Sequence, residues 1–301
     1  MCGIIGFTGK IPAKDVIING LERLEYRGYD SAGLALLGDG DITVRKRTGK
    51  VAELKALCAE DDNPSTCGIG HTRWATHGGV TDANAHPHRC GKVVLIHNGI
   101  IENYRQLVVE YGLADKLVSE TDSEVVCALL DTFYEGDPIA AIKKTVHALS
   151  GAFALCIMFQ DIPGTIYAIR NVSPMIATSC DKGSVIASDL TAVIAFSKEY
   201  FVVPEYHILT LTADGIKVCD MKGKEVKPEI LSVNWDIASA QKGGYPFFML
   251  KEIYEQPDAI RNTVTPRVNQ GLPDFTADGV DDSIFTNCKQ VTVVACGTAM
   301  H

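Results

Sequence analysis

The second residue of the sequence, Cys2, combines a nucleophilic side chain with a place next to the chain terminus. An initiator Met is commonly removed when a small residue follows it, and removal of Met1 would give Cys2 a free α-amino group. An α-amine has an ordinary pKa of about 7.7–8.0, so it can accept the proton of the thiol directly or through a water molecule. Gly3 has no side chain and lets a ligand approach closely. These residues favour a nucleophile that carries its own base; a Cys that merely begins a strand is the alternative.

A second chemical pattern ends the apolar run KVVLIHN, where Asn98 is followed by Gly99. The amide of Asn98 and the N–H of Gly99 can donate to one developing oxyanion, and losing one such donor typically costs about 3 kcal/mol of transition-state stabilisation. Asn-Gly is also a strong turn signal. The two interpretations are compatible, since an oxyanion site can lie at a turn.

Two oppositely charged residues could bind the two ends of an amino-acid zwitterion. Arg73, in the segment HTRWATHGG, can hold a carboxylate through two parallel hydrogen bonds. Asp122, at a predicted helix start, can hold an ammonium group. Taken alone, a surface ion pair and an acid at a helix terminus are the alternatives. The neighbouring Trp74 is either a lid over a small substrate or a core aromatic residue.

Histidines and polar loops provide further candidates. Five histidines lie between positions 71 and 97, at 71, 77, 86, 88 and 97, but HExxH and other recognised ligand spacings are missing, so we expect no metal ion. The loop EYRGYDSAG contains Arg27 and Tyr29, and the loop NAHPH contains His86. Polar loops of this kind commonly carry function.

Composition limits the class of protein. The 301 residues include 28 Lys or Arg and 37 Asp or Glu, a net charge of −9 that argues against a nucleic-acid groove. No apolar run approaches the roughly 20 residues that span a bilayer, so we expect no membrane segment. The start lacks the basic region of a secretory signal. The length alone suggests about two domains.

The ten cysteines predict neither a disulfide framework nor a zinc site. No CxxC is present, and the closest pair, Cys288 and Cys296, is eight residues apart. Scattered single cysteines are typical of a reducing compartment, so we expect a cytoplasmic protein whose cysteines mostly behave as small buried side chains.

The elements that must position these residues are read from hydrophobic periodicity. Strands are predicted over 3–8, 31–37, 42–47, 68–73 and 92–98, and a hairpin joins 153–159 to 165–170. Helices are predicted after Pro12 and over 102–111, 122–134 and 137–149, and Thr121 with Glu124 forms a capping-box start that places Asp122 in the first turn. Short strands joined by hairpins and interrupted by helices favour an α+β fold with helix-covered antiparallel sheets over a doubly wound sheet.

The pattern changes near residue 221. A polar stretch and a Gly-Gly pair predict a linker over 221–285 with a helix near 246–262. The segment KQVTVVACGTAMH then predicts a buried strand, with no following element before His301. We therefore expect one domain over 2–220, a linker, and the truncated start of a second domain over 286–301.

Six ordered motifs, CGIIGF, EYRGYDSAG, HTRWATHG, NAHPH, HNGIIEN and SETDSE, together resemble the class II glutamine amidotransferase domain. More narrowly, they resemble this domain in the glutamine–fructose-6-phosphate aminotransferases, and the YRGYDSAG form favours that group over the purine amidotransferases. KEIYEQP is similar to the interdomain helix of that group, and VVACGT to the first strand of its sugar isomerase (SIS) domain.

The resemblance implies a fold and a set of catalytic roles. The fold would be the four-layer αββα sandwich of the N-terminal nucleophile hydrolases. Cys2 would be the nucleophile, and Asn98 with Gly99 the oxyanion hole. Arg73 would hold the glutamine α-carboxylate and Asp122 its α-amino group.

The resemblance also assigns the surrounding residues. Thr76 and His77 would line the site, and Trp74 would gate the passage of ammonia. Arg27, Tyr29 and His86 would lie in neighbouring loops around the site.

By the same resemblance, L-glutamine would be hydrolysed to glutamate and ammonia through a γ-glutamyl thioester, without a cofactor. In the full-length enzyme, an expected homodimer, the ammonia would convert fructose 6-phosphate into glucosamine 6-phosphate. Because this chain ends where the sugar site begins, we expect it to hydrolyse glutamine but not to make the amino sugar. Cys296 would lie at the edge of that unfinished site.

Two alternatives to this function remain open. One is an N-terminal-Cys hydrolase of another amide, which would not need both Arg73 and Asp122. The other is a catalytically silent domain, if Met1 is retained and Cys2 lacks a free α-amine.

Overall fold

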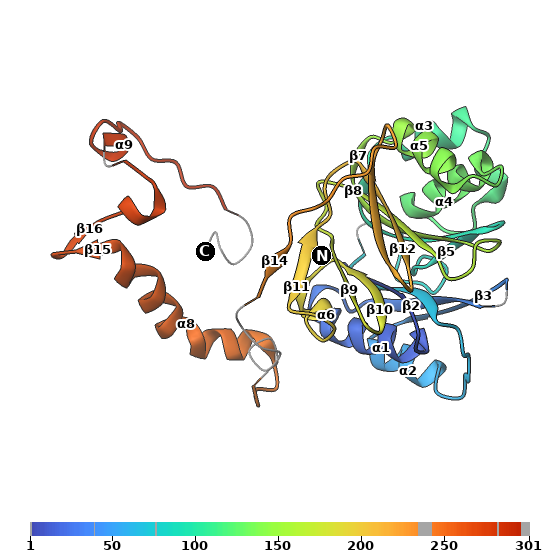
Figure 1. The fold of residues 1–301 in the computed structure, drawn as a ribbon, viewed down its shortest axis with the longest axis horizontal. Coiled ribbons are helices and arrows are strands. Elements are labelled where there is room, and N and C mark those ends of the chain that lie inside the picture. Colours follow the sequence, from blue (N-terminus) through green and yellow to red (C-terminus); the bar gives the residue numbers. More distant parts are fainter. Residues whose placement is uncertain (1, 39, 76, 234–242, 282, 296–301) are drawn as a thin grey trace. The chain divides into compact units, whose positions relative to one another are not determined.

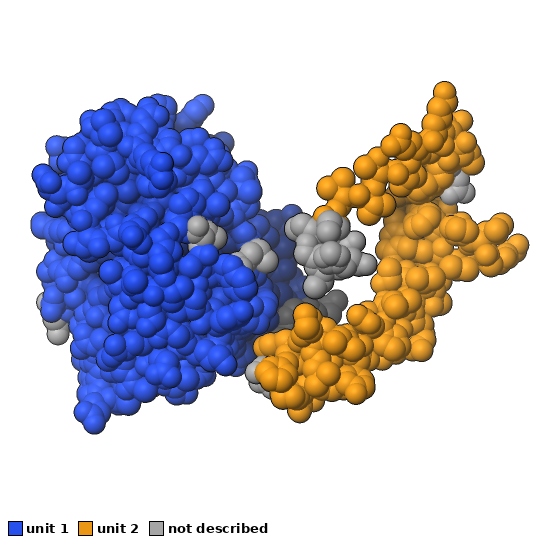
Figure 2. Space-filling view, turned by 180° about the vertical axis from the view of Figure 1, so that it is seen from behind, with its two compact units in different colours: residues 1–240 blue, residues 241–301 orange. Residues whose placement is uncertain are grey.

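The structure is a computed structural model of the 301-residue chain, and it describes all residues except 1, 39, 76, 234–242, 282 and 296–301. The chain divides into two compact units, residues 1–240 and 241–301, which are coloured separately in Figure 2. Each unit is described by itself below.

The first unit contains two antiparallel sheets (Figure 1). The larger sheet has the order β14 (Leu231–Ser232), β11 (Glu199–Val202), β9 (Ile176–Cys180), β10 (Gly183–Ala187), β1 (Gly3–Gly9), β4 (Cys67–Arg73), β2 (Ser31–Gly38), β3 (Asp41–Thr48). The smaller sheet has the order β13 (Gly215–Asp220), β12 (His207–Thr212), β8 (Ile166–Asn171), β7 (Gly151–Phe159), β6 (Val93–Ile101), β5 (His88–Cys90). The predicted hairpin is present as β7 and β8.

Helices cover the outer face of each sheet. The larger sheet packs against α1 (Ala13–Leu24), α2 (Val51–Leu57) and α6 (Leu190–Val193), and η1 (Glu25–Arg27) follows α1. The smaller sheet packs against α3 (Tyr104–Glu110), α4 (Asp122–Phe133) and α5 (Pro138–Ala148), with η2 (Ala114–Lys116) between α3 and α4. A third apolar cluster lies between the two sheets. The arrangement is therefore the predicted αββα sandwich, and the expected α+β class is confirmed.

The alternation of side chains along central strands explains the layers. In β1, Ile4 belongs to the cluster between the sheets, whereas Ile5 and Phe7 belong to the cluster under α1. Successive residues of a strand point to opposite faces, so a strand that is apolar at every position must be covered on both. A near-continuous apolar run in this protein therefore indicates a strand between two layers.

Two local expectations differ from the structure. The strand expected to end at Asn98 continues as β6 to Ile101, so Asn98-Gly99 lies within a strand and forms no hairpin turn. Thr121 does cap α4, since its Oγ1 accepts the Glu124 N–H at 3.3 Å. The Glu124 carboxylate, however, accepts the N–H groups of Val118 and Ser119 instead of completing a capping box with Thr121.

The second unit consists of short elements around one longer helix. These are α8 (Phe248–Val264), η3 (Thr265–Arg267), β15 (Val268–Asn269), β16 (Leu272–Pro273), η4 (Thr276–Asp278) and α9 (Ser283–Thr286). None of its described residues is buried, and no helix among the described residues is long and apolar enough to cross a membrane.

The buried strand expected within 289–301 is wrong for the described residues. Residues 291–295 form no strand, and Val293 and Val294 are 86% and 89% exposed. An apolar segment becomes a strand only when a neighbouring strand pairs with its backbone, and none does so for 291–295. Cys296 lies outside the described residues.

One glycine of the EYRGYDSAG motif is required by close packing. Gly33 pairs with His71 of β4 and with Lys46 of β3. A Cβ atom at Gly33 would lie 2.1 Å from the carbonyl oxygen of His86 and 2.9 Å from that of Arg45. Glycine at this position lets the loop that carries His86 rest directly on the backbone of β2.

We predict that Gly33→Ala lowers the free energy of unfolding by about 3 kcal/mol, because the backbone of the His86 loop must move away. Gly79→Ala is the matched control: a Cβ there meets no atom closer than 4.0 Å, so its effect should stay within about 0.5 kcal/mol. Urea unfolding followed by circular dichroism measures both. Equal losses in the two variants would show that the approach of the loop does not restrict position 33.

Candidate active site

Most of the predicted site residues line one small cavity in the first unit. Its volume is about 30 Å³, room for about one or two water molecules. It lies where β1 and β6 meet the end of β4 and the start of α4. Its lining consists of Cys2, Arg73, Trp74, His77, His86, His97, Gly99, Thr121, Asp122 and Ser123.

Cys2 is held by contacts to both its side chain and its backbone. The N–H of Trp74 donates to Sγ at 3.2 Å, and the thiol lies 3.5 Å from the Trp74 carbonyl oxygen. The carbonyl oxygen of Cys2 accepts from Arg27 Nε at 3.2 Å and from Asn98 Nδ2 at 3.1 Å. Burial raises the pKa of the Cys2 thiol, and the hydrogen bond from Trp74 opposes this only in part. The thiol therefore needs a base to react at neutral pH.

The Asn98-Gly99 pair lies in β6 opposite Ala154 and Phe153 of β7. Gly99 has φ +135°, and a Cβ on it would lie 2.0 Å from the carbonyl oxygen of Ala152, so this position requires glycine. Asn98 is 8% exposed, and Gly99 lines the cavity. The structure thus brings Cys2, Asn98 and Gly99 together.

Arg73 and Asp122 also reach this cavity, and both already have protein partners. The Arg73 guanidinium donates to the carbonyl oxygens of Gly79 at 3.0 Å, of Gly78 at 3.5 Å and of His77. A carboxylate oxygen of Asp122 accepts the Ile101 N–H at 2.8 Å. Arg73 is 4% exposed and Asp122 5% exposed. A cation and an anion therefore lie buried on one cavity. Arg73 donates to backbone oxygens, and Asp122 accepts from the Ile101 N–H and, at 3.4 Å, from the Ser123 hydroxyl.

The remaining predicted residues lie around the cavity. Trp74 and Tyr29 are about half exposed and meet edge to face, with ring centroids 5.3 Å apart. Arg27 forms an ion pair with Asp189 at 2.9 Å. The half-buried His77 lies against the Tyr104 ring at 5.9 Å. Thr76 lies outside the described residues.

Four of the histidines between positions 71 and 97 are buried together beside the cavity, and two of them, His86 and His97, line it. The rings of His71 and His86 stack at 4.1 Å, and those of His86 and His88 lie 4.7 Å apart. His97 is the fourth buried histidine. Burial lowers the pKa of all four, to about 3 for His71, so all four rings are neutral at pH 7. In the described part of the chain, no group of three or more His, Cys, Asp or Glu side chains is arranged to hold a metal ion.

Sequence reasoning missed several residues that support the site. The Asp30 carboxylate accepts the Ala75 N–H and the Ser31 hydroxyl, and so fixes the segment that follows Arg73. His97 Nδ1 lies 2.8 Å from the Ser123 hydroxyl, next to Asp122. Asp30 stood inside a motif already singled out, but His97 and Ser123 gave no spacing signal because strand β6 and helix α4 meet only in the folded chain.

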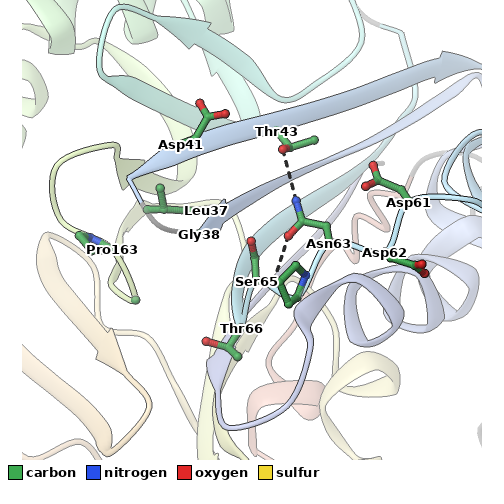
Figure 3. A pocket seen from close by; sticks show the side chains of 12 residues that line it. Leu37, Gly38, Asp41, Thr43, Asp61, Asp62, Asn63, Ser65, Thr66 and Pro163 are labelled. Carbon is green, nitrogen blue, oxygen red and sulfur yellow. Dashed lines mark hydrogen bonds between the residues drawn. The ribbon is translucent and has the colours of Figure 1, made fainter.

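A wider hollow elsewhere in the first unit has a different chemistry. It measures about 740 Å³ and lies between β2, β3 and the segment that leads into β4; Figure 3 shows Asp41, Asp61 and Asp62 around it. Among the described residues that line it, none is a cysteine, a histidine or a cation. The serine and threonine hydroxyls of this described lining have no histidine base beside them, and it holds no cation for a carboxylate, so the cavity at Cys2 is the candidate active site.

Comparison with known proteins finds relatives of this chain. Residues 71–195 match the model of the glutamine amidotransferase domain. The whole chain is 42% identical to half of the glutamine–fructose-6-phosphate aminotransferase (isomerizing) of Clostridium acetobutylicum and 42% identical to half of that of Aquifex aeolicus. The chain spans about half the length of the curated relatives it matches.

Solved structures share the fold. The glutamine phosphoribosylpyrophosphate amidotransferase of B. subtilis, complexed with ADP and GMP, matches 74% of this chain and 50% of its own, with a TM-score of 0.64 and 25% identity. A glutamine aminotransferase class-II domain protein of Silicibacter pomeroyi matches 73% of this chain and 99% of its own, with a TM-score of 0.51 and 14% identity. Residues 71–195 therefore match a glutamine amidotransferase domain, and the chain is similar, over its whole length, to one half of the glutamine–fructose-6-phosphate aminotransferases.

Proposed function

We propose that this chain hydrolyses L-glutamine to glutamate and ammonia, with Cys2 as the nucleophile. The observation that carries the proposal is the small cavity that Cys2 and Gly99 share with a cation, Arg73, and an anion, Asp122. An amide substrate with a free amino-acid end needs such a set of groups. The match of residues 71–195 to the glutamine amidotransferase domain supports the same reaction.

The chemical step begins at the Cys2 thiol. After removal of Met1, the α-amine takes the thiol proton, and Sγ adds to the side-chain carbonyl carbon of glutamine. The carbon–nitrogen bond then breaks, and the amine returns the proton to the departing ammonia. Water attacks the resulting γ-glutamyl thioester, the carbon–sulfur bond breaks, and glutamate leaves with the thiol restored. A base is needed because burial raises the pKa of this thiol.

The oxyanion of each tetrahedral intermediate would lie against Asn98 and Gly99. Asn98 Nδ2 is 3.1 Å from the backbone oxygen of Cys2, so its N–H groups are next to the nucleophile. Donors fixed in advance stabilise a developing negative charge without reorganising during the reaction. The positive φ of Gly99 and the hydrogen bonds of Asn98 supply that rigidity.

The two charges would bind the α-carboxylate and the α-ammonium of glutamine. A cavity of about 30 Å³ is too small for an amino acid. Binding therefore requires Arg73 to exchange backbone carbonyl partners for the substrate carboxylate, with movement of the segment 77–79. Trp74, which shares the exposed edge of the site with Tyr29, would cover the substrate and gate ammonia. Thr76 and His77 would line the site, and Arg27 and His86 would support it.

The names of the relatives suggest the fate of the ammonia. In a longer protein of their kind, we propose that it aminates fructose 6-phosphate in the second half, in amino-sugar biosynthesis, within a cytoplasmic homodimer. Because the first unit extends to residue 240, residues 241–285 would then act as the linker, with α8 as its helix, and 286–301 as the start of the sugar isomerase domain.

The nucleophile is tested first. Cys2→Ala should lower glutamine hydrolysis at least about a thousandfold, because no other group can form the thioester intermediate. Cys180→Ala, which changes a half-buried cysteine of β9 outside the cavity, should hydrolyse at the parent rate. Release of glutamate and ammonia measures both. The electrophilic glutamine analogue 6-diazo-5-oxo-L-norleucine should label the N-terminal peptide, as read by mass spectrometry.

The same mass measurement separates the alternatives. A chain that has lost Met1, is labelled at Cys2 and hydrolyses glutamine supports the proposal. A Cys2→Ala variant as active as the parent would overturn it. A chain that keeps Met1 and is inactive would favour the catalytically silent domain, and hydrolysis of other amides but not glutamine would favour a different hydrolase.

The ammonium-binding role is tested by Asp122→Asn. Asparagine keeps an oxygen that can accept the Ile101 N–H but loses the charge, so KM for glutamine should rise at least about tenfold while kcat changes less than about threefold. Glu124→Gln removes a charge from the same buried helical turn, outside the cavity, and should leave KM unchanged. An unchanged KM in Asp122→Asn would remove Asp122 from the substrate site.

The pH dependence follows from the buried thiol. The pKa of the Cys2 thiol is raised, so the reactive thiolate becomes more abundant as pH increases. The fraction of neutral α-amine, which serves as the base, also increases with pH. We expect kcat/KM to rise from pH 6 to pH 8, by up to about tenfold per pH unit. A value that is constant or falls over this range would contradict a neutral thiol with an amine base.

A further inference from the structure

The side chain of one buried histidine contacts the proposed oxyanion group directly. His71, in β4, is 1% exposed and lies two residues before Arg73. Its Nε2 is 3.1 Å from the carbonyl oxygen of His97 and 2.9 Å from the side-chain oxygen of Asn98. His71 begins the HTRWATHG motif, but the sequence assigns it no catalytic role, and it does not line the cavity.

The carbonyl contact fixes the tautomer of His71. A backbone carbonyl oxygen only accepts hydrogen bonds, so Nε2 at 3.1 Å from the His97 oxygen must carry the hydrogen. The other ring nitrogen, Nδ1, is buried and has no hydrogen-bond partner among the described residues. The neutral ring, with its hydrogen on Nε2, therefore satisfies the contacts that are present.

The tautomer in turn fixes the orientation of the Asn98 amide. The Nε2–H hydrogen is shared between two acceptors, so the Asn98 atom at 2.9 Å from it must be Oδ1 and not Nδ2. Nδ2 then faces the opposite way, where it donates to the backbone oxygen of Cys2 at 3.1 Å. A flipped amide would set two donors against each other at His71 and two oxygens against each other at Cys2.

The environment of His71 favours the neutral ring. The ring stacks on His86 at 4.1 Å, and Arg73 and His97 lie nearby. Burial lowers the pKa of His71 to about 3; the hydrogen bond with Asn98 opposes this shift, and the electrostatic effects of His97 and Arg73 add to it. The ring therefore offers the same single donor throughout the neutral range of pH.

We propose that His71 is a positioning residue that holds the Asn98 carboxamide with its N–H donors toward the carbonyl group attacked by Cys2. The proposal rests on the proposed glutaminase function, in which Asn98 stabilises the oxyanion. His71 touches neither substrate nor nucleophile; it acts through Asn98. Loss of its donor frees the amide to rotate, and the oxyanion then loses part of its stabilisation.

His71→Phe tests this, because phenylalanine keeps a ring for the stack on His86 and removes the donor. We expect kcat for glutamine to fall about 10- to 100-fold, up to the loss seen when an oxyanion donor is removed, with KM within about twofold. His71→Gln, whose amide can donate to Asn98, should recover most of the lost kcat. If the Phe variant does not fold, His71→Leu, which also lacks a donor, replaces it.

A matched control comes from the same histidine cluster. His88 is 2% exposed, lies against the His86 ring and bonds to Thr121, but it does not contact Asn98. His88→Phe should reduce the melting temperature to a degree similar to His71→Phe and leave kcat within about threefold of the parent. A similar loss of kcat in both variants would indicate a purely structural role and overturn the proposal.

A double-mutant cycle distinguishes action through Asn98 from any other effect. In an Asn98→Ala background, His71→Phe should reduce the residual kcat less than about twofold, because there is no amide left to orient. An undiminished effect of His71→Phe in that background would overturn the proposal, as would a parent-like kcat of His71→Phe alone. If the parent chain, with Met1 removed, hydrolyses no glutamine, the proposed function itself has failed.

Discussion

The face-to-face packing of two antiparallel sheets is the constraint on which the rest of the structure depends. Side chains that alternate along β1 and β7 give each of these strands two apolar faces, so each sheet needs one partner sheet and one layer of helices. In the resulting sandwich, β4 beside β1 brings Arg73 and Trp74 to Cys2, and the opposite sheet contributes Gly99 of β6. The site exists because the apolar faces of these strands are buried together.

Burying these polar groups at the site costs free energy, and their hydrogen bonds to one another and to the backbone offset that cost. An unpaired buried donor or acceptor costs about 1–3 kcal/mol. Arg73 is satisfied by backbone oxygens, Asp122 by the Ile101 N–H, and Asn98 by His71 and Cys2. The side chains proposed to meet glutamine are thus ordered before it arrives, and a substrate would replace protein contacts instead of ordering free side chains.

The same free-energy argument applies to the buried histidines beside the site. A histidine in a low-dielectric environment is most stable when neutral, and a neutral ring offers one donor and one acceptor at fixed positions. His71, stacked on His86, can therefore direct a neighbouring amide, which a charged or mobile side chain would do poorly. The four buried histidines, at positions 71, 86, 88 and 97, form a cluster of packed neutral rings.

The sequence by itself determined the elements and the residue types. Apolar periodicity located the central strands and helices of the first unit, and the motif resemblance supplied Cys2, Arg73, Asn98 and Asp122, because local patterns record which faces are buried and which side chains are reactive. Only the tertiary structure decided how these residues meet. Strand β6 continues through Asn98-Gly99, and Gly33 leaves room for the loop that carries His86. His71 contacts Asn98, which lies 27 residues further along the chain. The tertiary structure also decided that residues 291–295 form no strand, since backbone pairing depends on a neighbour. Contacts between distant strands depend on sheet order and register, which no short stretch of sequence encodes.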